Sequence, residues 1–137
     1  MKEKFKTLKI IHFGICAGVA LAYIIVGDLH TLEFLKLPEF NSGTNILLSI
    51  PLGALLVGEK LFKSQLKSID PNISAEDKIA PYQTASLIRW AVIEGAAFII
   101  LFMAKELIVV GILLILYLMY LRPTQDRMLR DLANAGV

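Results

Sequence analysis

The chain contains few of the residues from which reactive centres are built, with one cysteine and two histidines among 137 residues. A single cysteine, Cys16, excludes a disulfide within the chain, and a buried thiol among apolar residues is expected to be inert. The sequence also lacks metal-ligand spacing, a phosphate-binding loop and a nucleophile with its base. We therefore expect no enzyme activity, no metal and no cofactor. Nucleic-acid-binding motifs are absent as well, so nucleic acid is not an expected partner.

Charged residues are also scarce, at 19% of the chain, whereas hydrophobic residues reach 56%. Soluble domains have roughly 45–50% apolar residues, so this composition predicts an integral membrane protein. A helix needs about 20 residues to cross about 30 Å of hydrocarbon. Segments close to that length occur at residues 10–26, 46–62, 87–104 and 107–121. None alternates with period two, so we predict an all-α bundle of four transmembrane helices.

The distribution of basic residues predicts the orientation. Lysines are concentrated in the amino-terminal tail and in residues 60–78, and arginines follow the fourth segment. By the positive-inside rule, both termini lie in the cytoplasm of a multi-pass protein of the cell (inner) membrane. The net charge of +2 is thus a topology signal. The first apolar segment continues through residues 23–26, past a possible signal cleavage pattern at residues 20–22, which favours a retained helix.

Features outside the four segments are fewer. Residues 28–44 mix apolar side chains with few charges, as in a segment that lies in the membrane interface. Pro51, with two nearby glycines, predicts a bend in the second segment. After the fourth segment, Thr124 is a plausible cap for a short amphipathic helix at the cytoplasmic surface. Pairs at i,i+4 are expected there between Asp126 and Arg130 and between Arg127 and Asp131.

A weak internal repeat divides the chain in two. Residues 11–20 align with residues 88–97 without a gap, matching cation with cation, ring with ring, and Gly18 with Gly95. Three identities in ten positions also arise by chance among small residues, so duplication and coincidence both stay open. If the repeat is real, residues 1–66 form a first transmembrane hairpin, and residues 67–137 form a second with the cytoplasmic tail.

Small residues recur every four positions in two of the segments, at Gly14 and Gly18 in the first and at Ala91 and Gly95 in the third. Such stripes let helix backbones approach closely in membranes. They predict helix packing either within one four-helix chain or between the subunits of an oligomer.

Glu94 is the most informative residue, because it lies near the middle of residues 87–104. An ionisable group at that depth costs at least a few kcal/mol and by default marks a functional site. Burial favours a neutral carboxyl, so we predict that Glu94 binds a proton. A sodium ion wants several oxygen ligands, and Ser49, Tyr23 and Tyr117 are the nearest candidates, none of them clearly at the same depth. The alternative is a structural Glu94 that ties helices together by hydrogen bonds.

Four side chains are possible partners of Glu94. Arg89 lies five residues earlier, about 140° around the helix and roughly 7.5 Å along it, which disfavours a pair within one helix. Snorkelling of Arg89 beside an interfacial Trp90 explains this cation, and a pair between Arg89 and Glu94 of neighbouring chains is the alternative. His12 is expected at the interface. Glu59 ends the second helix, where it has an ordinary interfacial place or lines an entry route.

Tandem hairpins, small-residue stripes and one embedded glutamate in the second hairpin resemble the rotor-ring proteolipids, the c subunits, of rotary ATPases. The resemblance covers the four helices and implies a proton carrier at Glu94 and close packing at Gly14, Gly18 and Gly95, in a closed ring. The chain departs from that family in two respects. The carboxylate lies on the first helix of its hairpin instead of the second, and the first helix lacks the family's denser run of glycines.

Three functions are consistent with these residues. The first is a homo-oligomeric, proteolipid-like protein that binds protons or translocates ions through Glu94. The second is a structural or accessory membrane subunit that packs against a larger complex. The third is a small exporter of the multidrug-resistance type, which fits poorly because those proteins carry the glutamate in helix one and often have little charge bias.

Overall fold

The computed structural model describes residues 2–27 and 42–137, and in these residues it contains helices and no strands. The predicted interfacial segment, residues 28–44, lies almost wholly outside the described residues. The helices are α1 (Lys2–Val26), α2 (Ser42–Leu47), α3 (Ser49–Lys67), α4 (Ile79–Met103), the 3₁₀ turn η3 (Lys105–Leu107), α5 (Ile108–Tyr120) and α6 (Gln125–Asn134). The predicted all-α class is therefore confirmed.

Three of the helical stretches are long and apolar enough to cross a membrane: Glu3–Val26, Asn45–Lys67 and Ile79–Met103. The fourth predicted segment is shorter, because α5 has 13 residues and spans only about 20 Å. It passes the same test only together with α6, across a bend of 96°. The described chain thus offers three spans, or four if this bent pair is counted as one.

The break between α2 and α3 has a local cause. A proline ring clashes with the carbonyl four residues earlier, which for Pro51 is the carbonyl of Leu47. Helix α2 ends at Leu47, and α3 begins two residues later. The helix is thus interrupted at Leu48, one turn before Pro51, while Asn45–Lys67 still forms one apolar span, so the predicted bend stays a prediction.

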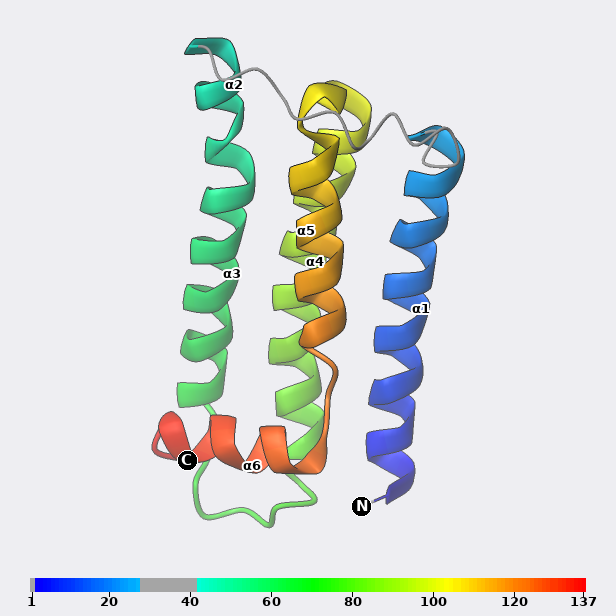
Figure 1. The fold of residues 1–137 in the computed structure, drawn as a ribbon. Coiled ribbons are helices and arrows are strands. Elements are labelled where there is room, and N and C mark those ends of the chain that lie inside the picture. The colour runs from blue at the N-terminus through cyan, green and yellow to red at the C-terminus, as the bar shows by residue number, and fades with distance from the viewer. Residues whose placement is uncertain (1, 28–41) are drawn as a thin grey trace.

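Helix α4 is the centre of the bundle, since it contacts α1, α3 and α5. Figure 1 shows α1 and α3 on opposite sides of the α4–α5 pair, with both termini at one end of the bundle. The first predicted hairpin, residues 1–66, is therefore not a packed unit, because its two long helices are separated by the second hairpin. The described chain forms one bundle around α4.

Near its end, α1 is held against this centre by Tyr23 and by the Val26 carbonyl. The Tyr23 hydroxyl donates a hydrogen bond to the Ala97 carbonyl of α4, and Tyr23 is fully buried. A Cβ atom on Gly111 would collide with the ring and hydroxyl of Tyr23, so α5 can pass beside this ring only with a glycine there. At the end of α1, Lys105 Nζ donates to the Val26 carbonyl at 3.0 Å.

Helix α6 crosses the end of the bundle, as Figure 1 shows. Its predicted cap is confirmed, since Thr124 Oγ1 accepts a hydrogen bond from the Arg127 amide at 3.1 Å. Met128 and Leu132 on one face are buried, as expected of an amphipathic helix. The predicted pair of Arg127 with Asp131 is wrong: Arg127 donates to the Tyr120 carbonyl, and Asp131 accepts from Tyr82 of α4 at 2.8 Å.

Replacing Gly111 by alanine should destabilise the bundle. The new methyl group must push Tyr23 away from α5, and overpacking of this kind costs about 1–3 kcal/mol. The measurement is the free energy of unfolding of the detergent-solubilised protein, followed by the fluorescence of its one tryptophan. Gly53→Ala is the matched control, because an added Cβ on this helical glycine of α3 meets nothing within 4 Å and the position lies outside the small-residue stripes that are candidates for contact between chains. Equal stabilities of the two variants would contradict the packing described here.

Candidate functional site

Glu94 lies on α4 with its side chain partly exposed on the outside of the bundle. Among the residues that the structure describes, it forms no hydrogen bond or ion pair. Its neighbours Ala91 and Gly95 are exposed, and a Cβ added to Gly95 would meet nothing within 4 Å. The carboxyl is therefore partly exposed on α4, beside residues that no other described helix packs against closely.

The small residues of α1 are exposed in the same way. Gly14 and Gly18 both lie on the outside of the bundle, where an added Cβ would also meet nothing within 4 Å. The interpretation that Gly14, Gly18, Ala91 and Gly95 pack helices within one chain is therefore wrong. The contacts between α1 and α4 use other faces of both helices. Packing of these small residues between chains stays a prediction.

Arg89 has a different environment from the one predicted. It is only 5% exposed, and its Nη1 donates to Glu59 Oε2 of α3 at 3.3 Å. The guanidinium also lies over the ring of Phe62, 3.6 Å from its centroid, which adds a cation–π attraction. Arg89 thus ties α4 to α3 and does not snorkel to the surface. A neighbouring chain's Glu94 has no access to a cation buried in this way.

Glu59 is the shared acceptor of two cations on the α3 side. Its side chain is 40% exposed and faces the buried Arg89 on one side and the exposed Lys63, at 3.8 Å, on the other. Glu59 therefore has a defined partner in α4. The prediction that Glu59 ends the second helix is wrong, because α3 continues past it to Lys67. Whether it lines an entry route stays a prediction.

His12 and Trp90 meet inside the bundle instead of at its surface. Both are buried, and their ring centroids are 4.7 Å apart. His12 Nε2 lies 2.7 Å from the carbonyl oxygen of Leu118 on α5. A carbonyl only accepts, so Nε2 carries the proton, and the Cys16 sulfur 3.6 Å away receives at most a weak share of it. This cluster joins α1, α4 and α5.

The structure thus separates the predicted site residues into three places. Glu94 is partly exposed on α4 and has no hydrogen-bond or ion-pair partner among the described residues, Arg89 and Glu59 join α3 to α4, and His12 and Trp90 lie between α1, α4 and α5. The hydroxyl of Tyr23, a predicted oxygen ligand, donates its hydrogen bond to the Ala97 carbonyl. No group of three or more metal-binding side chains comes together in the described residues.

Sequence reasoning missed Phe62 beneath Arg89 and the Leu118 carbonyl that accepts from His12. The second partner is a backbone atom, which no residue type could have indicated. The first could have been suspected only once α3 and α4 were known to be neighbours. Comparison of this chain with protein-family models, with curated proteins and with solved structures finds no match.

The two cations beside Glu59 should be coupled to it unequally. The Arg89 side chain is 7% exposed, whereas that of Lys63 is 66% exposed. Double-mutant cycles with Glu59→Gln should give a coupling of about 1 kcal/mol or more with Arg89→Met and below about 0.5 kcal/mol with Lys63→Met. The measurement is again the free energy of unfolding in detergent. Equal couplings would show that burial of Arg89 does not strengthen this pair.

Proposed function

We propose that this protein is a subunit of a membrane-embedded oligomer in which Glu94 binds a proton at the contact between chains. The observation that carries the proposal is the lack of any hydrogen-bonding or ionic partner for Glu94 in the described chain. Nine residues separate Glu94 from the end of α4 at Met103, a distance of about 14 Å. That is close to half of the roughly 30 Å thickness of the hydrocarbon.

A carboxyl group at that depth cannot remain charged against lipid chains, because its desolvation is too costly. It is therefore either neutral or covered by polar groups of another protein surface. The exposed Ala91 and Gly95 beside it allow another helix to approach the α4 backbone closely. A second chain that covers Glu94 removes the carboxyl from contact with lipid, and a bound proton keeps it neutral.

The finer membrane arrangement belongs to the same proposal. We place the protein in the cell (inner) membrane with both termini in the cytoplasm, on the evidence of its basic residues. Figure 1 supports a common side for the two termini. The turn η3 and helix α5 serve as a short fourth span, with α6 lying along the cytoplasmic surface, and the bilayer thins locally to match the shorter helix. The resemblance to rotor-ring proteolipids adds the expectation of a closed ring of copies, although Glu94 lies on a different helix of the hairpin.

An apolar carbodiimide tests the site, because it reacts with protonated carboxyls in apolar surroundings. We expect it to modify Glu94 in the assembled protein, as read by peptide mass spectrometry. Glu94→Gln should abolish the labelling and any proton flux through reconstituted vesicles, yet keep the particle mass. Glu106→Gln is the control, since Glu106 is an exposed carboxyl in the turn η3 and should not alter the labelling.

The mass of the native particle separates the alternatives. A multiple of the 15.2 kDa chain with labelled Glu94 supports the proposal. An oligomer that dissociates on Glu94→Gln would assign Glu94 a structural role between copies. A single unlabelled chain would contradict the proposal and favour an accessory subunit whose larger partner covers this face.

A further inference from the structure

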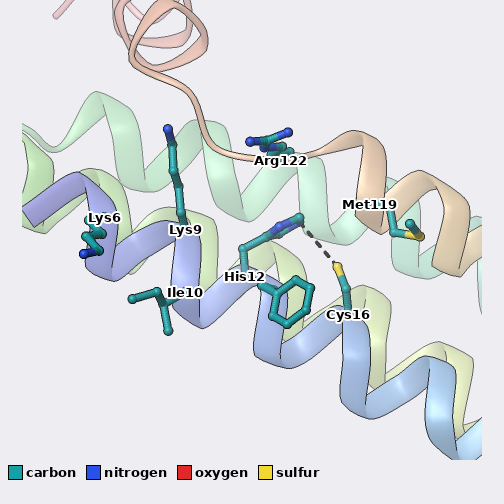
Figure 2. A pocket seen from close by; sticks show the side chains of 8 residues that line it. Lys6, Lys9, Ile10, His12, Cys16, Met119 and Arg122 are labelled. Atoms are coloured by element: carbon teal, nitrogen blue, oxygen red, sulfur yellow. Dashed lines mark hydrogen bonds between the residues drawn. The ribbon is translucent and has the colours of Figure 1, made fainter. Parts of the chain in front are cut away.

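A groove of about 510 Å³ opens between α1 and the segment that ends α5, in the half of the bundle nearest both termini. Figure 2 shows Lys9 extending from α1 toward the segment after α5 that carries Arg122. The walls combine basic and apolar side chains: Lys6, Lys9, Arg122, Ile10, Phe13 and Met119, with His12 and Cys16 at the base.

The three cations of the groove are available to a ligand. Lys6, Lys9 and Arg122 are exposed, and none of them forms an ion pair with a carboxylate in the part of the chain that the structure describes. Asp126 lines an adjoining groove together with Lys6 and Lys9. One carboxylate near three cations leaves an excess of positive charge, so the groove attracts an anion.

Both walls of the groove change from basic to apolar in the same direction. On α1, Lys6 and Lys9 precede Phe13, which is 73% exposed. On the other wall, Arg122 lies one turn beyond Met119, which is 53% exposed. The charged end of each wall therefore faces the end of the bundle where the termini lie, and the apolar end faces its middle. A phospholipid in a bilayer has this same sequence of chemistry along the membrane normal.

The base of the groove is closed by buried side chains. His12 of α1 donates a hydrogen bond to the Leu118 carbonyl, which joins α1 to α5 at this level. The ring of Trp90 on α4 packs against the His12 ring. A ligand can therefore lie along the groove but cannot pass between these helices. An elongated molecule with one anionic end fits this shape better than a compact ion does.

We propose that this groove binds an anionic phospholipid, with its phosphate against Lys6, Lys9 and Arg122 and an acyl chain along Ile10, Phe13 and Met119. Basic pockets between helices on the cytoplasmic side are general sites for anionic headgroups. The site rests on the membrane placement proposed above and is independent of Glu94.

Trp90 provides the test, because it is the one tryptophan of the chain and contacts His12 at the base of the groove. The protein is placed in phosphatidylcholine nanodiscs with either brominated phosphatidylglycerol or brominated phosphatidylcholine at equal mole fraction. Bromine quenches tryptophan at close range. The phosphatidylglycerol should reach half-maximal quenching at a several-fold lower mole fraction. Equal quenching by the two lipids would overturn the proposal without need of any variant.

Neutralising the groove tests its residues. Each basic side chain near a membrane surface strengthens anionic-lipid binding by up to about fivefold, so Lys6→Gln, Lys9→Gln and Arg122→Gln together should abolish the several-fold preference for phosphatidylglycerol. The matched control is Lys60→Gln, Lys67→Gln and Arg130→Gln, which removes the same charge from exposed positions outside the groove. Equal losses in both triple variants would show general surface attraction and overturn the assigned site.

Two further arms fix the ligand and separate this proposal from that for Glu94. Inorganic phosphate at millimolar concentration should leave the quenching unchanged, whereas reversal would assign the groove to a free anion and overturn the lipid. Glu94→Gln should retain the full preference for phosphatidylglycerol. In the unmutated protein, absence of carbodiimide labelling at Glu94 with an intact lipid preference would refute the proton site alone. Labelling of Glu94 without any preference for phosphatidylglycerol would refute the lipid site alone.

Discussion

A polar group inside an apolar helical bundle has no water to bind, so a partner within the protein stabilises it. Three such partnerships join the long helices, while Ser86 Oγ, Arg89 Nε and Trp90 Nε1 are buried without a hydrogen-bond partner in the described residues. Tyr23 donates to a carbonyl of α4, His12 donates to a carbonyl of α5, and Arg89 of α4 pairs with Glu59 of α3. Each joins a different pair of helices. The central position of α4 follows, because it contributes a group to two of these contacts and packs the Trp90 ring against the third.

Arg89 and Glu94 show how one helix serves two environments. They lie five residues apart, about 140° around the helix, so they cannot share a face. The direction of Arg89 is fixed by Glu59 and by the ring of Phe62, and Glu94 is thereby turned outward. Arg89 has its carboxylate partner, Glu59, inside the chain, whereas a partner for Glu94 must come from outside the chain. The isolated state of Glu94 is in this way a consequence of how the bundle closes.

The helical class, the cap at Thr124 and the amphipathic nature of α6 could be predicted from the sequence, because each depends on residues that lie close together along the chain. The neighbours of each helix could not. Apolar side chains give little information about partners where every helix is apolar, and a stripe such as Gly14 and Gly18 has the same sequence whether it faces inward or outward. His12 and Trp90 resemble interfacial residues in the sequence, yet together with a backbone carbonyl they make a buried contact. The role of Glu94 stays a prediction, and the partial exposure of its side chain could be known only from the helix arrangement.

The proposed lipid groove and the exposed glycines of α1 lie at different depths along this helix. Ile10 at the edge of the lipid groove, Gly14 and Gly18 follow one another at intervals of four residues, so they form a continuous row along the outside of the helix. Lys6 and Lys9 at the start of α1 require water or anionic headgroups, which excludes tight apolar packing against another chain at that level. Gly14 and Gly18 lie deeper and have no side chain to fill the space beside them. A neighbouring chain packed on these glycines would therefore contact the proposed lipid at its cytoplasmic edge. The lipid would fill the space between the two chains there, because their basic helix ends repel each other.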